Sequence, residues 1–157
     1  MRSERPVLPS LLDRLLDFEP EKHEDSPVDR KQSVKNFKLS LQRDLEWLLN
    51  TRRVSEAPPG TSEELGLSLY CYGLPEFSNV DITTIASVLE NRIETAITTF
   101  EPRLTNVRVT MPTAPTQERT AHFVVEAILL INPVPERVVF NTVLELNKGE
   151  YQVRGED

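Results

Sequence analysis

The rhythm of the apolar residues changes between Phe100 and Leu104, from the period of a helix to the period of a strand. Upstream they recur at steps of three and four, and they are Ile82, Ile85, Leu89, Ile93, Ala96, Ile97 and Phe100. Downstream they alternate, at Val107, Val109 and Met111. Pro102 lacks an amide hydrogen and disfavours helical backbone at Glu101, so we expect the helix to end at Phe100 or Glu101. The chain therefore contains both helix and sheet, and Glu101 and Arg103 lie at the bend between them.

Further helices are expected before this bend and further strands after it. The helices are 7–18, with Ser10 as N-cap, 33–50, and one that runs from a cap at Ser78 or Asp81 to the bend. The strands are 104–111, 120–131, 138–146 and 151–154, and Ala127 to Ile131 is apolar enough to be covered on both faces. Residues 62–72 fit a helix or a strand. This order predicts an α+β fold, with N-terminal helices packed on a mainly antiparallel β-sheet formed by the C-terminal half.

We expect two parts of unequal size. The 157 residues suit one hydrophobic core, which we assign to a single α+β domain over residues 32–157. Residues 1–31 hold a short helix and then a charged linker from Glu19 to Lys31. This helix is too short to be stable alone, so we predict that it orders against a partner through its leucines, which are Leu11, Leu12, Leu15 and Leu16.

Charge and composition narrow the classes of function. A net charge of −7 and a pI near 5.0 argue against a general nucleic-acid binder and against attachment to anionic lipid by charge. No apolar run approaches membrane-spanning length, so direct membrane insertion is not expected. The single cysteine cannot form an intramolecular disulfide, and the N-terminus shows no apolar signal core. We therefore expect a cytoplasmic protein.

Acidic side chains near the bend invite comparison with glycosidases, whose two catalytic carboxyl groups lie roughly 5 to 10 Å apart. Glu90 and Glu94 are one helical turn apart, but the solvated outer face of a helix accounts for them more simply. Glu94 and Glu101 would lie about 10 Å apart along a helix axis, at the upper limit of that range. The sequence therefore gives no convincing catalytic pair.

Other kinds of site have less support still. Cys71 lies between two tyrosines with no histidine nearby in sequence, which is typical of a buried, inert thiol. His23 and His122 show no spacing typical of a zinc site, and the five glycines form no phosphate-binding loop. We predict no metal, no cofactor and no small-molecule substrate.

Glu101 differs from the other acidic residues because of its place at a helix end. A carboxylate there faces the negative end of the helix dipole, which is unfavourable by a few tenths of a kcal/mol unless a cation offsets it. Arg103, two residues on, can do so. Either the pair clamps the corner, or the carboxylate and guanidinium are presented together for bidentate contact with another chain.

Four segments of the chain, in order, match a known pattern. They are Pro9–Leu15 (PSLLDRL), Asp44–Arg53 (DLEWLLNTRR), Tyr72–Phe77 (YGLPEF) and Phe100–Leu104 (FEPRL). With this set the chain resembles the TssE family, the type VI secretion counterpart of a phage contractile-tail baseplate wedge protein. The resemblance covers nearly the whole chain. It implies a structural subunit of a bacterial contractile injection machine, in the cytoplasm at the baseplate docked to the inner-membrane complex.

The resemblance also implies partners and site residues. Glu101, Pro102 and Arg103 match the family's glutamate-proline-arginine signature, which contacts the wedge subunits TssF and TssG. We add four partner-binding residues from another matching segment, and they are Tyr72, Gly73, Leu74 and Pro75. The baseplate subunit TssK and the contractile sheath are further partners, and the sheath would start its assembly on the C-terminal strands, about residues 138–154.

Two alternatives stay open at this point. One is a peptidoglycan hydrolase that uses Glu101 as general acid, in keeping with the family's older label of a lysozyme-like domain. It needs a second carboxylate across a cleft. The other is a regulatory adaptor that shares the fold but binds a different protein.

Overall fold

A computed structural model describes residues 7, 9–16, 21, 30–53, 62–75, 82–112 and 120–155, and of the helical residues 82–85 it describes the backbone alone. The chain forms two compact units, Met1–Leu41 and Gln42–Asp157, and each is described by itself. Helix α2, Arg30–Asn50, contributes residues to both units. The domain boundary predicted between residues 31 and 32 stays a prediction.

The first unit contains the short helix α1, Leu11–Leu15. Ser10 caps it as predicted, because the Ser10 hydroxyl oxygen accepts the N–H of Asp13 at 3.2 Å. The leucines of this helix are exposed, Leu11 at 76% and Leu15 at 82%. A helix of five residues cannot hide such side chains by itself.

Helix α2 also begins in the first unit, at Arg30, three residues before its predicted start. The apolar stripe marks a helix only from its first apolar residue, Val34, so the pattern misses the polar first turn. The predicted linker therefore ends earlier than Lys31, and its residues before Arg30, apart from Glu21, lie outside the described residues.

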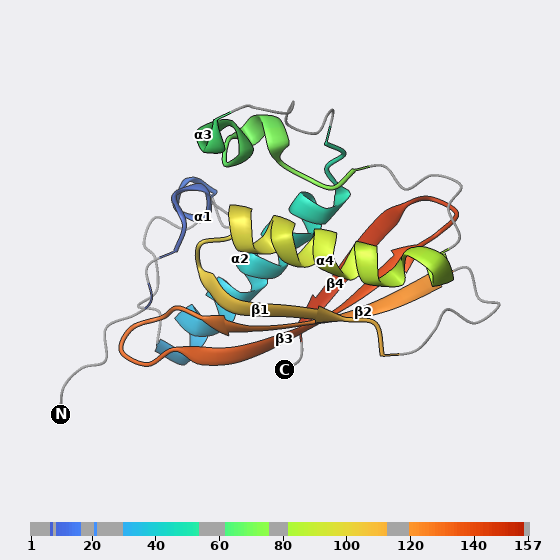
Figure 1. Cartoon of the computed structure of the whole chain (residues 1–157). Coiled ribbons are helices and arrows are strands. Elements are labelled where there is room, and N and C mark those ends of the chain that lie inside the picture. The colour runs from blue at the N-terminus through green and yellow to red at the C-terminus, as the bar shows by residue number, and fades with distance from the viewer. Residues whose placement is uncertain are drawn as a thin grey trace. The chain divides into compact units, whose positions relative to one another are not determined.

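The second unit is built on a four-stranded antiparallel sheet in the order β1-β2-β3-β4 (Figure 1). The strands are β1 Leu104–Thr110, β2 Thr120–Leu129, β3 Glu136–Glu145 and β4 Glu150–Gly155. Each strand pairs with the next one along the chain, so β1 and β4 form the two edges. Helices precede strands in the chain, and the predicted α+β class with a mainly antiparallel sheet is confirmed.

Helix α4, Ile82–Phe100, packs on β1 and β2 and supplies one side of the core. The most buried apolar side chains of this unit include Leu45, Leu48, Leu49, Leu89, Ile93, Ile97, Phe123, Val125, Leu129, Phe140 and Val153. The predicted caps of α4, Ser78 and Asp81, lie outside the described residues. Leu130 is 50% exposed, so the expectation that Ala127 to Ile131 is covered on both faces is wrong. β2 ends at Leu129, and Leu130 follows it beyond the pairing with β3, while its N–H donates to Arg103 O at 2.8 Å.

Residues 62–72 form helical turns rather than a strand. Helix α3 covers Glu63–Gly66, and the 3-10 helix η1 covers Leu69–Cys71. Cys71 is buried, as predicted. Of the helices in the described ranges, none is long and apolar enough to cross a membrane.

Glu90 and Glu94 do not form a solvated face, so that interpretation is wrong. The N–H of Met111 donates to Glu90 Oε1 at 2.6 Å, and the N–H of Val109 donates to Glu94 Oε2 at 3.2 Å. The first amide directly follows β1 and the second lies in it, and β1 is an edge strand of the sheet. Because a buried amide needs an acceptor, the two carboxylates of α4 stabilise this edge.

Candidate functional site

The chain bends at Pro102, between the end of α4 and the start of β1, as predicted. The N–H of Glu101 still donates to Ile97 O at 2.9 Å, in the helical pattern, and α4 ends at Phe100. The N–H of Leu104 then donates to Glu101 O at 3.1 Å, which closes a tight turn with Pro102 exposed at its tip. Glu101 is therefore the first residue of this turn, and Arg103 is the third.

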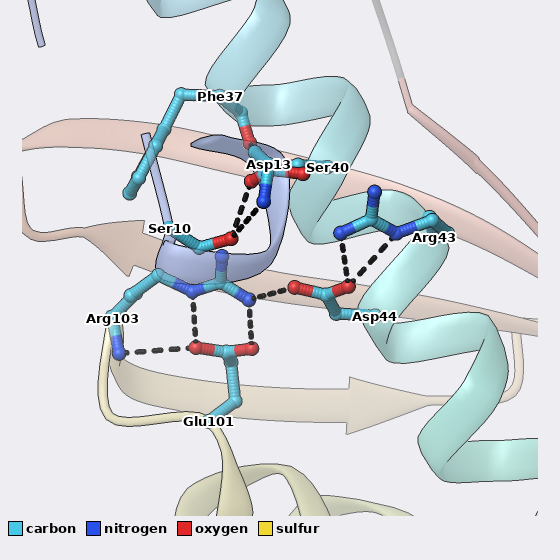
Figure 2. Close-up of polar contacts among 8 residues, drawn as sticks. All are labelled: Ser10, Asp13, Phe37, Ser40, Arg43, Asp44, Glu101 and Arg103. Atoms are coloured by element: carbon cyan, nitrogen blue, oxygen red, sulfur yellow. Dashed lines mark hydrogen bonds and ion pairs between the residues drawn. The ribbon is translucent and has the colours of Figure 1, made fainter. Parts of the chain in front are cut away.

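Glu101 and Arg103 pair with each other. Arg103 Nε donates to Glu101 Oε1 at 2.6 Å, and Arg103 Nη2 donates to Glu101 Oε2 at 2.5 Å (Figure 2). The backbone N–H of Arg103 also donates to Oε1, at 3.2 Å. Glu101 is only 5% exposed, so its carboxylate is held inside the protein by a bidentate ion pair.

Asp44, from α2, completes this ion pair. Arg103 Nη2 donates to Asp44 Oδ2 at 2.7 Å, and Arg43 donates to the other oxygen, Asp44 Oδ1, through Nε at 3.0 Å and Nη2 at 2.8 Å (Figure 2). The Arg43 guanidinium also lies over the ring of Trp47, 4.9 Å from its centroid. A continuous charged network therefore runs from the bend to the surface of α2, where Trp47 is 51% exposed.

Tyr72 belongs to the same corner. Its ring meets the ring of Phe100 edge to face, with centroids 5.2 Å apart. Burial, and then the negative charges of Asp44 and Glu101, raise the pKa of the Tyr72 hydroxyl. Burial also opposes the charge on Arg103, but the hydrogen bonds and charges of Glu101 and Asp44 outweigh burial and raise the pKa of Arg103. The two carboxylates therefore favour the charged form of the guanidinium.

Backbone contacts hold the segment Tyr72–Pro75 in place. The N–H of Leu74 donates to Thr51 O at 2.9 Å, and the N–H of Arg53 donates to Leu74 O at 2.8 Å. Gly73 has φ +99°, and a Cβ at this position would lie 2.2 Å from Thr51 O. Only glycine fits such a conformation at such a distance.

The structure thus brings together only some of the predicted partner-binding residues. Glu101 and Arg103 pair in the network, Tyr72 packs on Phe100 beside it, and Pro102 lies at its exposed turn. Gly73 and Leu74 are buried and shape the backbone, while Pro75 is half-buried. Asp44 was missing from the predicted set, although it is the first residue of the matching segment Asp44–Arg53.

The carboxylates of this network are not arranged as the catalytic pair of a hydrolase. Both carboxylate oxygens of Glu101 accept hydrogen bonds from Arg103, and Asp44, a second carboxylate, binds the same guanidinium. A cavity of about 90 Å³ beside Phe100 and Cys71 is lined by neither carboxylate. In the part of the chain that the structure describes, no three His, Cys, Asp or Glu residues are placed to hold a metal ion. The geometry is that of a structural clamp with an exposed rim.

Comparison with known proteins identifies one family. The model of the family described as baseplate wedge protein gp25 matches residues 35–134, which is more than half of the chain. The match contains Asp44, the segment Tyr72–Pro75 and the signature from Glu101 to Arg103. No curated protein and no solved structure matches the chain significantly.

Proposed function

Since the chain belongs to the family of baseplate wedge protein gp25, and is thus a structural component of a phage-tail-like baseplate, we propose that it is the TssE-type subunit of a type VI secretion baseplate. The family match confirms the resemblance seen in the sequence. The secretion context, the named partners and the place at the inner-membrane complex belong to the proposal.

The observation that supports a contact role best is the network from Glu101 through Arg103 and Asp44 to Arg43. Next to a buried ion pair, it fixes a rim that is formed by the exposed Pro102 and Trp47 and by the half-buried Arg43. Tryptophan and arginine are the residues that most often dominate binding energy at protein interfaces. We therefore assign the contact with TssF and TssG to this rim, with Glu101 as the residue that positions it.

The same proposal gives the other predicted residues distinct parts. Tyr72 and Pro75, both half-buried, extend the rim, while the buried Gly73 and Leu74 keep their backbone in place. TssK and the contractile sheath remain further partners, the latter at the C-terminal strands. Residues 1–31 form a separate N-terminal part in the proposed domain arrangement. This part orders against a partner, which the exposed leucines of α1 contact.

Binding of co-expressed TssF and TssG to Trp47→Ala tests this assignment, with a thermal melt of the same variant. We expect the affinity to fall about tenfold or more while the melting temperature holds, because a half-exposed side chain contributes little to the fold. Val134→Ala is the control, since Val134 is 68% exposed and lies between β2 and β3. Equal affinities for the two variants would remove the rim from the interface.

A further inference from the structure

A small pocket lies between α4 and the segment from Gly66 to Pro75, and its volume is about 90 Å³. Arg92 and Thr95, which are three residues apart and so share a face of α4, line one side of it. Arg53, which follows α2, lines it as well. We name this the arginine pocket, because Arg53 and Arg92 are the only charged residues among the lining residues that the structure describes.

The charge in the arginine pocket is opposite in sign to that of the whole chain. The chain has 25 Asp and Glu residues against 18 Lys and Arg residues, which gives a net charge of −7. Of the described residues that line the pocket, however, none is acidic. The electrostatic field inside the pocket therefore favours a negatively charged group.

The two arginines can bind such a group in addition to their present contacts. Arg53 and Arg92 each take part in another interaction of the protein. A guanidinium has five N–H donors, so one arginine can bind two acceptors. Arg103 does so in the neighbouring network, where it binds both Glu101 and Asp44. Two guanidinium groups at one pocket suit a carboxylate best, because its two oxygens match their paired donors.

The other walls of the pocket are held in place and are mostly apolar. The N–H of Arg53 donates to Leu74 O at 2.8 Å, and the Thr99 hydroxyl donates to Thr95 O at 2.7 Å. The buried Cys71 lines the pocket as well. Apolar walls exclude water, so an ion pair in this pocket is stronger than one on an open surface and is less screened by salt.

The volume limits the size of the ligand. Pockets for small molecules and cofactors have volumes of about 300 to 1,000 Å³, so the arginine pocket is too small for a nucleotide or a sugar. Its size suits the end of one acidic side chain. Leu74 and Pro75, which also line it, belong to the segment that we assign to partner contact. A side chain in this pocket therefore comes from a protein bound at the adjoining surface.

We propose that the arginine pocket receives the carboxylate of an aspartate or glutamate side chain of the partner subunit. Arg53 and Arg92 donate to its two oxygens, and the Thr95 hydroxyl lies on the same side of the pocket as Arg92. The inference rests on the proposed function for the identity of the partner, which is TssF or TssG. It adds the chemistry of one contact and the place where that contact is made.

Titration of the full chain with acetate, followed by the NMR signals of the backbone amides, tests the pocket without a partner. At constant ionic strength we expect saturable shifts at Gly66, Cys71 and Ala96, which line the pocket, and none with acetamide, a neutral analogue of similar size. Arg92→Gln should weaken acetate binding about tenfold, because a charge-assisted contact is lost. Arg108→Gln is the matched control, since Arg108 is also exposed but lies on β1. Absence of saturable shifts, or saturation by inorganic phosphate and not by acetate, would overturn the proposal.

Binding of co-expressed TssF and TssG tests the occupant. We expect Arg92→Gln to bind about tenfold more weakly than the wild type and with a smaller dependence on salt, while Arg108→Gln binds as the wild type does. A thermal melt of Arg92→Gln should match the wild type, because this side chain is exposed.

The same binding experiment separates this inference from the proposed function. If Arg92→Gln and Arg108→Gln bind equally well while Trp47→Ala binds weakly, the pocket has no part in the interface and the proposed function stands. If the wild type binds neither subunit, the proposed function fails together with the named partner, while a saturable acetate site upholds the pocket itself.

Discussion

Arg103 Nη2 lies 2.7 Å from Asp44 Oδ2, across 59 residues of sequence. The contact joins α2 to the bend that follows α4, while Glu101 holds the same guanidinium from the other side. The signature residues therefore complete a structural link within the second unit before any partner is bound. A variant of either carboxylate changes the stability of the fold as well as the proposed interface, and the two effects need separate measurements.

Glu101→Gln should lower the free energy of unfolding by about 3 kcal/mol, because it leaves the charge of Arg103 in a low-exposure site without its main partner. Asp44→Asn should cost only about 1 kcal/mol, since the Asp44 side chain is more exposed and Glu101 still neutralises Arg103. Urea unfolding of both variants measures the two values.

The control for this pair is Glu126→Gln. Glu126 pairs with Arg137 at 2.6 Å, but both side chains are exposed, so the unfolding free energy should change by no more than about 0.5 kcal/mol. If Glu126→Gln lowers the free energy of unfolding as much as Glu101→Gln does, burial does not decide the strength of these ion pairs.

Gly73→Ala should destabilise the protein by about 3 kcal/mol or more. The new methyl group would overlap Thr51 O at 2.2 Å, and the φ of +99° is unfavourable for any residue with a Cβ. Gly66→Ala is the matched control, because its Cβ meets no atom within 4 Å. Thermal unfolding should separate the two variants clearly, and similar melting temperatures would contradict the close approach of Thr51 and Gly73.

Local features of the sequence predicted the bend well. Pro102 and the change of period act within a few residues, so the end of α4 at Phe100 followed from sequence alone. The irregular pairing of β1 between Thr105 and Arg108, with Asn106 at φ +52°, left no trace in the alternation of apolar residues. A backbone irregularity of this kind depends on the neighbouring strand rather than on residue type.

The polar faces of the helices were the main failure of the sequence interpretation. Glu90 and Glu94 look like solvated residues because helical periodicity separates polar from apolar faces but does not show which polar face meets a strand edge. The contact of Asp44 with Arg103 was overlooked for the same reason. Each contact joins residues far apart in the chain, and only the tertiary structure brings them together.

Stability should fall as the pH rises above about 10, the ordinary tyrosine pKa. Burial raises the pKa of Tyr151 well above that value, and burial with the charges of Asp44 and Glu101 raises the pKa of Tyr72. Above pH 10 the unfolded chain therefore loses these two protons before the folded chain does. The free energy of unfolding is unaffected below that pH and falls as the pH rises from there toward the pKa values of the folded state. Melting temperatures between about pH 8 and 11 measure the slope.

Tyr151→Phe should flatten this alkaline slope, because it removes the more strongly shifted hydroxyl. Phe123→Leu is the control, since it weakens the same core without changing a titrating group, and its melting temperature should be offset by a similar amount at every pH. An unchanged slope for Tyr151→Phe would mean that other groups govern the alkaline transition.

Glu90→Ala should open the outer edge of β1. The Glu90 carboxylate accepts the N–H of Met111 at 2.6 Å, and a hydrogen bond to a charged group contributes about 1.5 kcal/mol or more. The amide of Met111 should then exchange roughly tenfold faster, and the variant should self-associate more readily because an unpaired edge is a template for another strand. Asn91→Ala, an exposed change one residue away on α4, should alter neither property. Native-state hydrogen exchange and sedimentation of both variants measure the two properties. If Glu90→Ala changes neither of them, Glu90 does not protect this edge.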